Sequence, residues 1–324
     1  MTGRLAVLVP VFNGGVLLEE SIRSCAGSGL DPQRYEILVV DNCSTDGAVD
    51  RLSAANPDGV PIRVYRNSRN LGRIGNWNRA VEIAETQGFS WATFLFVGDV
   101  WLPGGSLPRI LALLENHQAD FALTSYQIVD LRSNCRLFTP RVSIPGKELL
   151  IGSRNLIGKL LDRGGIPICP LQCNVYSLKS PGLLRFLESD PILTDSISTV
   201  EFLHHTNGKT MIVSEPFMAW RLHPGRFYAS RDILEFSSGD LRLLQETQSL
   251  TGAEVNWNRA KAHALISLLQ TAVRFEPWYR WPALLVGGMR LFGSRPGSVS
   301  PWAVCWIAFR KLFFHESPMH IDAC

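Results

Sequence analysis

The first hundred residues alternate between short, continuous apolar runs and segments with a helical spacing of apolar positions. Three runs stand out, at 5–13, 36–42 and 93–99, and the last two end on carboxylates, Asp41 and Asp99. Continuous apolar runs of this length, separated by amphipathic segments, predict parallel strands in a sheet covered on both faces. Ligands of such sheets bind beyond the carboxyl ends of the strands. We therefore expect Asp41 and Asp99, each at a strand end, to lie on one rim and face one ligand.

The alternation of strand-like and helix-like segments continues along the chain, but the difference between them is less clear. Further strands are predicted at 61–65, 121–126 and 210–213, and helices at 16–25, after Asp46, from the Asn70 loop through Ala84, at 107–114 and at 196–206. The pattern weakens between 128 and 170. From Arg231 onward the apolar spacing is again helical.

Four motifs occur in order within this alternating pattern. They are Val9–Asn13, Val39–Gly47, Asn70–Ala80 and Gly98–Pro103. At these spacings they resemble the inverting glycosyltransferases of family 2, and a fainter match continues through Ser214–Phe217 and Arg221–Gly225.

The resemblance implies an α/β fold of the GT-A class. In this Rossmann-like fold a mostly parallel mixed sheet is flanked by helices, and this chain adds a C-terminal helical extension. We expect a nucleotide-sugar-binding part at 1–125, an acceptor-binding part at 126–230, and a helical region at 231–324 that associates with a membrane or forms a dimer.

Composition narrows the class of protein. The chain has 324 residues, 46% of them hydrophobic, and a formal net charge of only +3, which does not suggest a nucleic-acid partner. Seven scattered cysteines fit a reducing compartment better than a disulfide framework. Cys169 and Cys173 have a metal-like spacing, but no second pair completes a zinc site, so buried thiols are the better interpretation. A strand begins within a few residues of Met1, so we expect no signal peptide and a cytoplasmic location.

Asp41 is the first candidate for nucleotide binding. At a strand end it is placed to accept hydrogen bonds from a pyrimidine edge or a ribose hydroxyl. The resemblance implies the same role, with the opposite wall formed by Pro10, Val11, Phe12 and Asn13. The competing interpretation is that Asp41 only caps the turn through Ser44 and Thr45.

The loop that contains Asn70, Gly72 and Arg73 is the second candidate. It leads into a helix N-terminus, where phosphate or sugar oxygens are favoured, and Arg73 adds a cation that could reach a diphosphate. Asn76 and Asn78 in the following turns fit either a ligand role or a structural one.

The resemblance also implies a divalent cation, Mn²⁺ or Mg²⁺. Asp99 stands where the family usually carries an Asp-X-Asp or Asp-Asp motif, but Gly98 and Val100 flank it, so a single carboxylate remains. One carboxylate with phosphates and water is sufficient in principle. The family counterpart of His223 often supplies a further ligand, and imidazole suits Mn²⁺ better than Mg²⁺. A lone histidine of this kind is also commonly structural.

The general base is expected at the start of the helix that precedes Glu215 and Pro216, where family members place an aspartate. In this chain that position is Asp195, which we predict to be the helix N-cap, with Glu201 as the second candidate. A purely structural cap is the alternative for Asp195, and the two roles are compatible.

The segment from Arg274 to Lys311 differs in character from the rest. Six basic residues stand against the single acid Glu276, a net of +5, among several Trp and Phe residues. No apolar run is long enough to span a bilayer. The mixture suits a membrane interface, and a bundle packed on the catalytic part or on a second subunit is the alternative.

These observations predict an inverting glycosyltransferase that uses a UDP- or dTDP-sugar. The acceptor is expected to be a glycan, lipid-linked or part of a polysaccharide, at the inner face of the membrane, with peripheral membrane contact and a homodimer as possible states. Two rivals stay open: transfer to a soluble small molecule or protein, and a member that keeps the fold but has lost metal-dependent turnover.

Overall fold

The computed structural model describes residues 3–55, 59–131, 135–139, 144–168, 170–188, 193–222 and 233–275. The chain forms two compact units. Among the described residues, the first, here called the sheet unit, comprises those up to 153 and from 168 to 222, and the second, the helical unit, comprises 154–167 and 233–275. His223, Cys169 and the basic aromatic segment beyond Phe275 lie outside the described residues.

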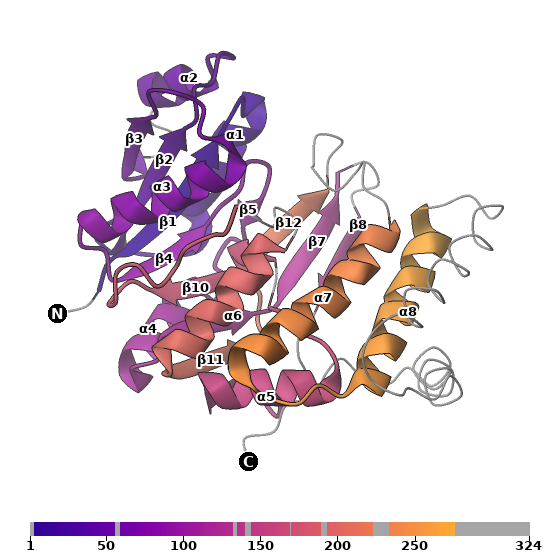
Figure 1. Ribbon diagram of the computed structural model, residues 1–324. Coiled ribbons are helices and arrows are strands. Elements are labelled where there is room, and N and C mark those ends of the chain that lie inside the picture. The colour runs from indigo at the N-terminus through magenta and orange to yellow at the C-terminus, as the bar shows by residue number, and fades with distance from the viewer. Residues whose placement is uncertain are drawn as a thin grey trace. The chain divides into compact units, whose positions relative to one another are not determined.

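A mixed sheet of eight described strands forms the centre of the sheet unit (Figure 1). In spatial order the strands are β3 (Ile62–Arg66), β2 (Tyr35–Asp41), β1 (Leu5–Val11), β4 (Trp91–Phe94), β10 (Asn174–Ser177), β6 (Phe121–Thr124), β11 (Lys209–Val213) and β9 (Glu148–Gly152). β10 and β9 are antiparallel to their neighbours, whereas β1 pairs in parallel with both β2 and β4. The predicted mostly parallel mixed sheet is confirmed.

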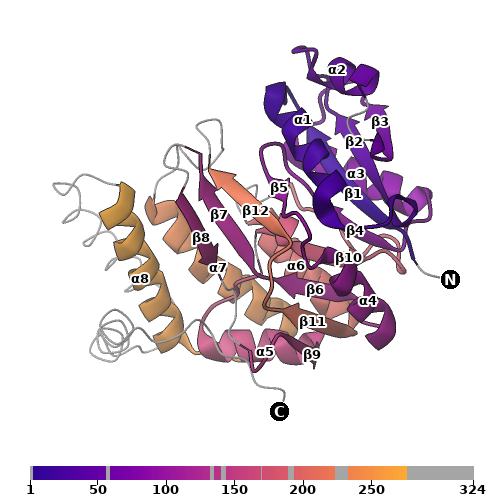
Figure 2. The ribbon, with the colours of Figure 1, turned by 180° about the vertical axis from the view of Figure 1, so that it is seen from behind.

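Helices cover both faces of this sheet, as the continuous apolar runs predict. On one face, Val7, Val9 and Val39 share a buried core with α1 (Gly15–Ser24), α2 (Ala48–Ala55) and α4 (Leu107–His117). On the other face lie α3 (Gly72–Thr86) and α6 (Thr194–Thr206), both in front of the sheet in Figure 1, whereas α1 and α4 face the viewer in Figure 2. The central strands β1 and β2 are therefore buried on both sides, which explains why their apolar runs do not alternate.

A second, four-stranded sheet has the order β5 (Val100–Trp101), β12 (Met218–Leu222), β7 (Tyr126–Asp130) and β8 (Cys135–Thr139). It changes two predictions. The run expected at 121–126 divides at Ser125 between β6 and β7, which belong to different sheets. The run expected to end at Asp99 is part of the larger sheet only as far as Phe94, where β4 ends. The chain then turns at Gly98, where φ is +96°, and enters β5 of the second sheet. Asp99 thus precedes β5 and does not end a strand of the larger sheet.

The helical unit contains most of α5 (Ser153–Arg163), with α7 (Ile233–Thr251) and α8 (Trp257–Phe275). Arg259 of α8 forms an ion pair of 3.1 Å with Asp162 of α5. Gly164 closes α5 at φ +74°, and a Cβ there would lie 2.3 Å from the backbone nitrogen of Ala260, so only glycine fits. The helices predicted after residue 231 are confirmed as far as Phe275. None of the described helices is long and apolar enough to cross a bilayer.

Candidate functional site

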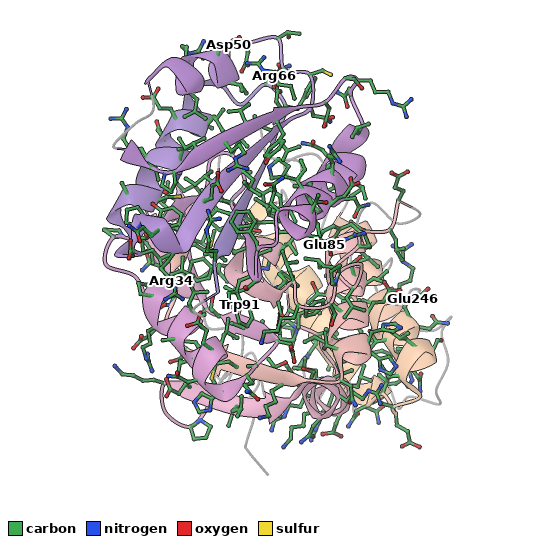
Figure 3. The ribbon with its side chains drawn as sticks, turned by 90° about the vertical axis from the view of Figure 1, so that its left-hand side faces the viewer. Arg34, Asp50, Arg66, Glu85, Trp91 and Glu246 are labelled. Carbon is green, nitrogen blue, oxygen red and sulfur yellow. The ribbon has the colours of Figure 1, made fainter. Side chains whose placement is uncertain are left out.

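The carboxyl ends of β1, β2, β3 and β4 point to the same edge of the larger sheet, and this edge with the loops that follow is called the rim. Figure 3 shows Asp50 and Arg66 together at this end of the sheet unit, away from Trp91 at the start of β4. Parallel strands bring their carboxyl ends to one edge, so residues distant in sequence meet here.

Hydrogen bonds join the loop after β1 to the loop after β2. The Asn13 backbone N–H donates to Ser44 Oγ (2.9 Å), and the Thr45 N–H donates to Asn13 Oδ1 (2.9 Å). Asp46 accepts from the backbone N–H groups of Gly15 (2.7 Å) and Ala48 (3.1 Å), and the bond from Gly15 is the main reason that the pKa of its carboxyl is lowered. The two loops therefore form one connected surface at the rim.

Asp41 ends β2, as predicted, and its side chain is almost completely buried. Its Oδ1 accepts from the backbone N–H of Ser44 (2.9 Å), so the turn-capping role is present. Its Oδ2 lies 3.7 Å from Arg66 Nη1, beyond hydrogen-bond distance, and Arg66 also pairs with Asp50. One carboxylate oxygen therefore holds the turn, while the other faces a half-exposed arginine that can move aside.

The segment predicted to form the opposite wall follows the same edge. Pro10 and Val11 are within β1, in register with Val40 and Asp41 of β2. The next side chain, Phe12, is 54% exposed, which is unusual for an aromatic ring in a loop fixed on both sides. The ring therefore offers an apolar face to solvent, one residue after Val11, the partner of Asp41 in the sheet.

The loop of Asn70, Gly72 and Arg73 joins the same edge. Gly72 begins α3 at φ +71°, and Asn70 Oδ1 accepts from its N–H at 2.8 Å. The guanidinium of Arg73 lies over the ring of Trp77, 4.9 Å from its centroid, a contact that restricts its position.

The two asparagines left open by the sequence are structural. Asn76 is buried and donates to the backbone oxygen of Val40 (3.0 Å). Asn78 makes a reciprocal pair with Phe186, donating to its carbonyl (2.9 Å) and accepting from its N–H (2.8 Å).

Asp99 is completely buried between the two sheets. Its Oδ2 accepts from Gln172 Nε2 (2.9 Å), and its Oδ1 accepts from the backbone N–H of Arg221 in β12 (3.1 Å). The Arg221 side chain also donates to the carbonyl of Gly98 and pairs with Glu20 of α1 at 2.9 Å. These bonds make Asp99 a junction between the turn at 96–99, the start of β10 and β12.

This geometry does not fit a divalent cation at Asp99. Each carboxylate oxygen already accepts a hydrogen bond, one from a strand backbone N–H and one from the buried Gln172, and Asp99 itself is completely buried, with no exposed surface at which a nucleotide-bound cation would meet it. Within the described parts of the chain, no three His, Cys, Asp or Glu side chains lie close enough together to hold a metal ion by themselves. His223, the second predicted ligand, lies outside them.

Asp195 is the second residue of α6, and the predicted N-cap position is wrong: the helix begins at Thr194 and its N-cap is Leu193, two residues before the predicted cap. The carboxylate is in the first turn, where the helix dipole favours its charged form. The Asp195 Oδ1 accepts from the N–H of Ser196 (2.9 Å).

The direction of α6 follows from the strand after it. Asn207 ends the helix in a left-handed conformation, and β11 begins at Lys209 in parallel with β6. The C-terminal end of α6 is therefore at the edge opposite the rim. From its last residue to its first, the 13-residue helix extends about 18 Å toward the rim, at a rise of about 1.5 Å per residue. Asp195 thus lies on the rim side, and Glu201 is about 9 Å further from it along the axis.

The connection before α6 is held along α3. Glu85 accepts from the Gly182 N–H (2.8 Å) and pairs with Arg185 (2.6 Å), and Asn78 pairs with Phe186 as described. The segment 182–188 thus runs alongside α3, from the C-terminal end of this helix in the direction of its N-terminal turns at the rim. Glu201, by contrast, is half-buried, and its pKa is raised by burial and lowered in part by His205.

Sequence reasoning missed the residues that hold the rim together, among them Asn42, Asn67, Gln172 and Arg221. Asn42 stood inside a recognised motif, but nothing in the sequence marks it as buried, and only the structure shows that it is 3% exposed. Gln172 and Arg221 come from segments more than seventy residues after Asp99, and no local pattern connects them to it.

Comparison with known proteins identifies relatives for part of the chain. It is 26% identical over 125 residues to the putative teichuronic acid biosynthesis glycosyltransferase TuaG of Bacillus subtilis, which covers 39% of this chain and 47% of that protein. It is 28% identical over 173 residues to the abequosyltransferase RfbV of Salmonella typhimurium, covering 50% and 49%. The chain thus spans about half the length of these relatives.

Solved structures share the fold. S. aureus TarS 1–349 in complex with UDP-GlcNAc has a TM-score of 0.60 at 17% identity, covering 95% of this chain and 85% of that one. The mannosyltransferase PcManGT of Pyrobaculum calidifontis, in complex with GDP-Man and Mn²⁺, has a TM-score of 0.51 at 16% identity, covering 98% and 89%. The family model described as glycosyl transferase family 2 matches residues 6–177, more than half of the chain. The chain therefore belongs to glycosyl transferase family 2 and has the GT-A fold.

Proposed function

We propose that this protein is an inverting glycosyltransferase that moves a sugar from a UDP- or dTDP-sugar to a hydroxyl of a glycan acceptor. The observation that carries the proposal is the rim: Asp41 and Phe12, which lie within the segment matched by the family model, and the start of α6 come to one edge of the sheet. TarS and PcManGT, which share the fold, are seen with UDP-GlcNAc and GDP-Man.

Nucleotide recognition rests on Asp41 and Phe12. When Arg66 turns toward Asp50 alone, Asp41 Oδ2 is available to accept a hydrogen bond from a pyrimidine N–H or a ribose hydroxyl. The exposed Phe12 ring supplies a stacking surface, and stacking of a base on an aromatic ring contributes about 1–3 kcal/mol. Asn13 fixes the loop on which the ring stands.

Transfer is a direct displacement at the anomeric carbon. Asp195 removes the proton of the acceptor hydroxyl, whose oxygen forms a new bond to that carbon from the face opposite the nucleotide. The bond from the carbon to the diphosphate oxygen breaks, and the nucleoside diphosphate leaves with the electron pair. Asp195 is preferred to Glu201 because the direction of α6 puts it on the rim side.

The departing diphosphate needs positive charge. The family resemblance suggests a divalent cation for this purpose, but Asp99 does not fit one, so no step is assigned to a cation here. Arg73, held over Trp77 at the beginning of α3, is the side chain of this chain that we assign to the phosphates.

A membrane-associated glycan is the acceptor class that we favour. TuaG is named for teichuronic acid biosynthesis, and another relative, from Bacillus spizizenii, is a poly(ribitol-phosphate) beta-glucosyltransferase, 27% identical over 122 residues. The basic aromatic segment after Phe275 supports peripheral contact with the inner face of the membrane. Dimer formation through this segment is the competing proposal.

The test is a panel of nucleoside diphosphate sugars screened by calorimetry, followed by detection of released UDP or dTDP with lipid-linked acceptors. We expect one uridine or thymidine donor to bind and to be consumed only when an acceptor is present. Binding without turnover on any acceptor would favour the non-catalytic alternative. Absence of binding to all UDP- and dTDP-sugars would refute the proposed donor class.

A further inference from the structure

Four asparagine side chains form a continuous hydrogen-bonded network beneath the rim. Asn42 is next to Asp41 in the chain, and Asn67 follows β3. Asn67 Nδ2 donates to the Oδ1 atoms of Asn42 (3.1 Å) and Asn76 (2.8 Å). Asn42 Nδ2 donates to Asn70 Oδ1 at 2.9 Å. The network thus joins the ends of β2 and β3 to the first turns of α3.

The Asn42 amide has no hydrogen-bonding capacity left unused. Its Oδ1 accepts from the Leu71 N–H (2.8 Å) and from Asn67, and its Nδ2 donates to Asn70 and to the Gly72 carbonyl (3.1 Å). Two accepted and two donated bonds are the full complement of a primary amide. The side chain is 3% exposed, so water cannot replace a lost partner easily.

Backbone groups fix which way the amides point. The Leu71 N–H can only donate, so it must face Asn42 Oδ1, and the Gly72 N–H must likewise face Asn70 Oδ1. The Val40 carbonyl can only accept, so it must face Asn76 Nδ2. The positions of oxygen and nitrogen in these side-chain amides are therefore determined by their backbone partners. An aspartate at position 42 would turn an oxygen toward two acceptors, Asn70 Oδ1 and the Gly72 carbonyl.

The network also controls the surroundings of Asp41. The Asn42 N–H donates to the Val11 carbonyl (2.8 Å), and the Asn67 N–H donates to the Asp41 carbonyl (2.9 Å). Asn67 follows Arg66, the cation that faces the second oxygen of Asp41. Because Asn67 is held in place, the backbone from which the Arg66 side chain extends is held as well. Holding Asn42 in the same way holds the peptide bond that joins it to Asp41.

We propose that Asn42 is a positioning residue for nucleotide binding: its neutral amide, through the bonds to Asn67, Asn70 and the 71–72 backbone, holds Asp41 in the geometry that accepts the nucleotide. This inference rests on the proposed function, since it requires Asp41 to contact the nucleotide. The inference also predicts that an aspartate at position 42, although it has the same shape as asparagine, cannot hold Asp41 in this geometry.

The experiment measures UDP and dTDP binding to the full chain by calorimetry in wild type, Asn42→Asp and Asn78→Asp. Asn78 of α3 is the matched control because its amide also has a donated and an accepted bond, but it lies outside the network. We expect Asn42→Asp to weaken binding about tenfold to a hundredfold, as loss of buried hydrogen bonds does, and Asn78→Asp to stay within about twofold. Equal losses in both variants, or none in Asn42→Asp, would overturn the inference.

A double-mutant cycle separates positioning from general damage to the fold. If Asn42 acts through Asp41, adding Asn42→Asp to Asp41→Ala should weaken binding little further, whereas fully additive losses would contradict the proposal. Should Asn42→Asp not fold, Asn67→Ala removes only the donor between two amides, and we expect about a threefold to tenfold loss; unchanged affinity would be equally damaging. A wild type that binds neither nucleotide would instead refute the proposed function, and this inference with it.

Discussion

Replacement of Asp41 by alanine and by asparagine separates its two roles. Asparagine keeps an oxygen for the Ser44 N–H, now 2.9 Å from Asp41 Oδ1, but presents an NH₂ group where Oδ2 was. That group donates and cannot accept from a base N–H or a ribose hydroxyl. Alanine removes both oxygens. The asparagine variant therefore tests the nucleotide contact, and the alanine variant tests the contact and the turn together.

The expected magnitudes follow from the hydrogen bonds. Losing an acceptor for a buried or ligand donor costs about 1–3 kcal/mol, so both variants should bind UDP or dTDP about 5- to 150-fold more weakly. Only alanine also leaves the Ser44 N–H without its partner, so its free energy of unfolding should fall by a further ~1 kcal/mol.

Calorimetry with UDP and dTDP, together with urea unfolding of the same samples, measures both quantities. Nucleotide affinity that is unchanged in Asp41→Asn would remove Asp41 from the site. If the two variants lose affinity only in proportion to lost stability, Asp41 is a turn cap and nothing more.

Three further outcomes are expected. Asp195→Asn should lower turnover by a factor of ~10²–10⁴ with donor affinity intact, as for a general base, while Glu201→Gln stays active; the opposite result would assign the base to Glu201. Asp99→Ala should reduce stability by about 1–3 kcal/mol because two buried donors lose their acceptor, but Mn²⁺ binding to the UDP complex, followed by electron paramagnetic resonance, should equal that of wild type; a selective loss of Mn²⁺ binding would make Asp99 a ligand. The chain should sediment with anionic liposomes less as salt rises and less when cut after Phe275, and equal sedimentation of both forms would refute a peripheral tail.

The sequence was sufficient for the order of elements at the nucleotide side of the fold. Continuous apolar runs predicted β1 and β2 correctly, and Asp41 lies at a strand end as expected. This worked because burial on both faces imposes the same local requirement on each residue of a run. At Asp99 the reasoning failed, because only Thr93 and Phe94 of the seven-residue run belong to β4 and the rest connects β4 to β5 in the second sheet, and Gly98 gave the only local sign of the turn.

Contacts between distant segments were beyond local patterns. Gln172 bonds to Asp99 across 73 residues, and the identity of either residue says nothing about the other. The N-cap of α6 failed for a smaller reason. Asp195 is a favourable cap residue, but the helix includes both Asp195 and Thr194, so the cap is Leu193. Helix ends are set by such local balances, which a single sequence does not determine.

The arrangement of the connections explains how the proposed nucleotide site and the proposed catalytic base, from opposite halves of the sequence, reach one rim. β10 runs opposite to its neighbours and so ends at the edge away from the rim. The chain must return before α6 can begin there, and it does so along α3, fastened by Glu85 to Arg185 and by Asn78 to Phe186. The same helix begins at the asparagine network beside Asp41. α3 is therefore in contact both with the loops of the proposed nucleotide site and with the segment that leads to Asp195. It is the element that holds this site and Asp195 in fixed positions relative to each other.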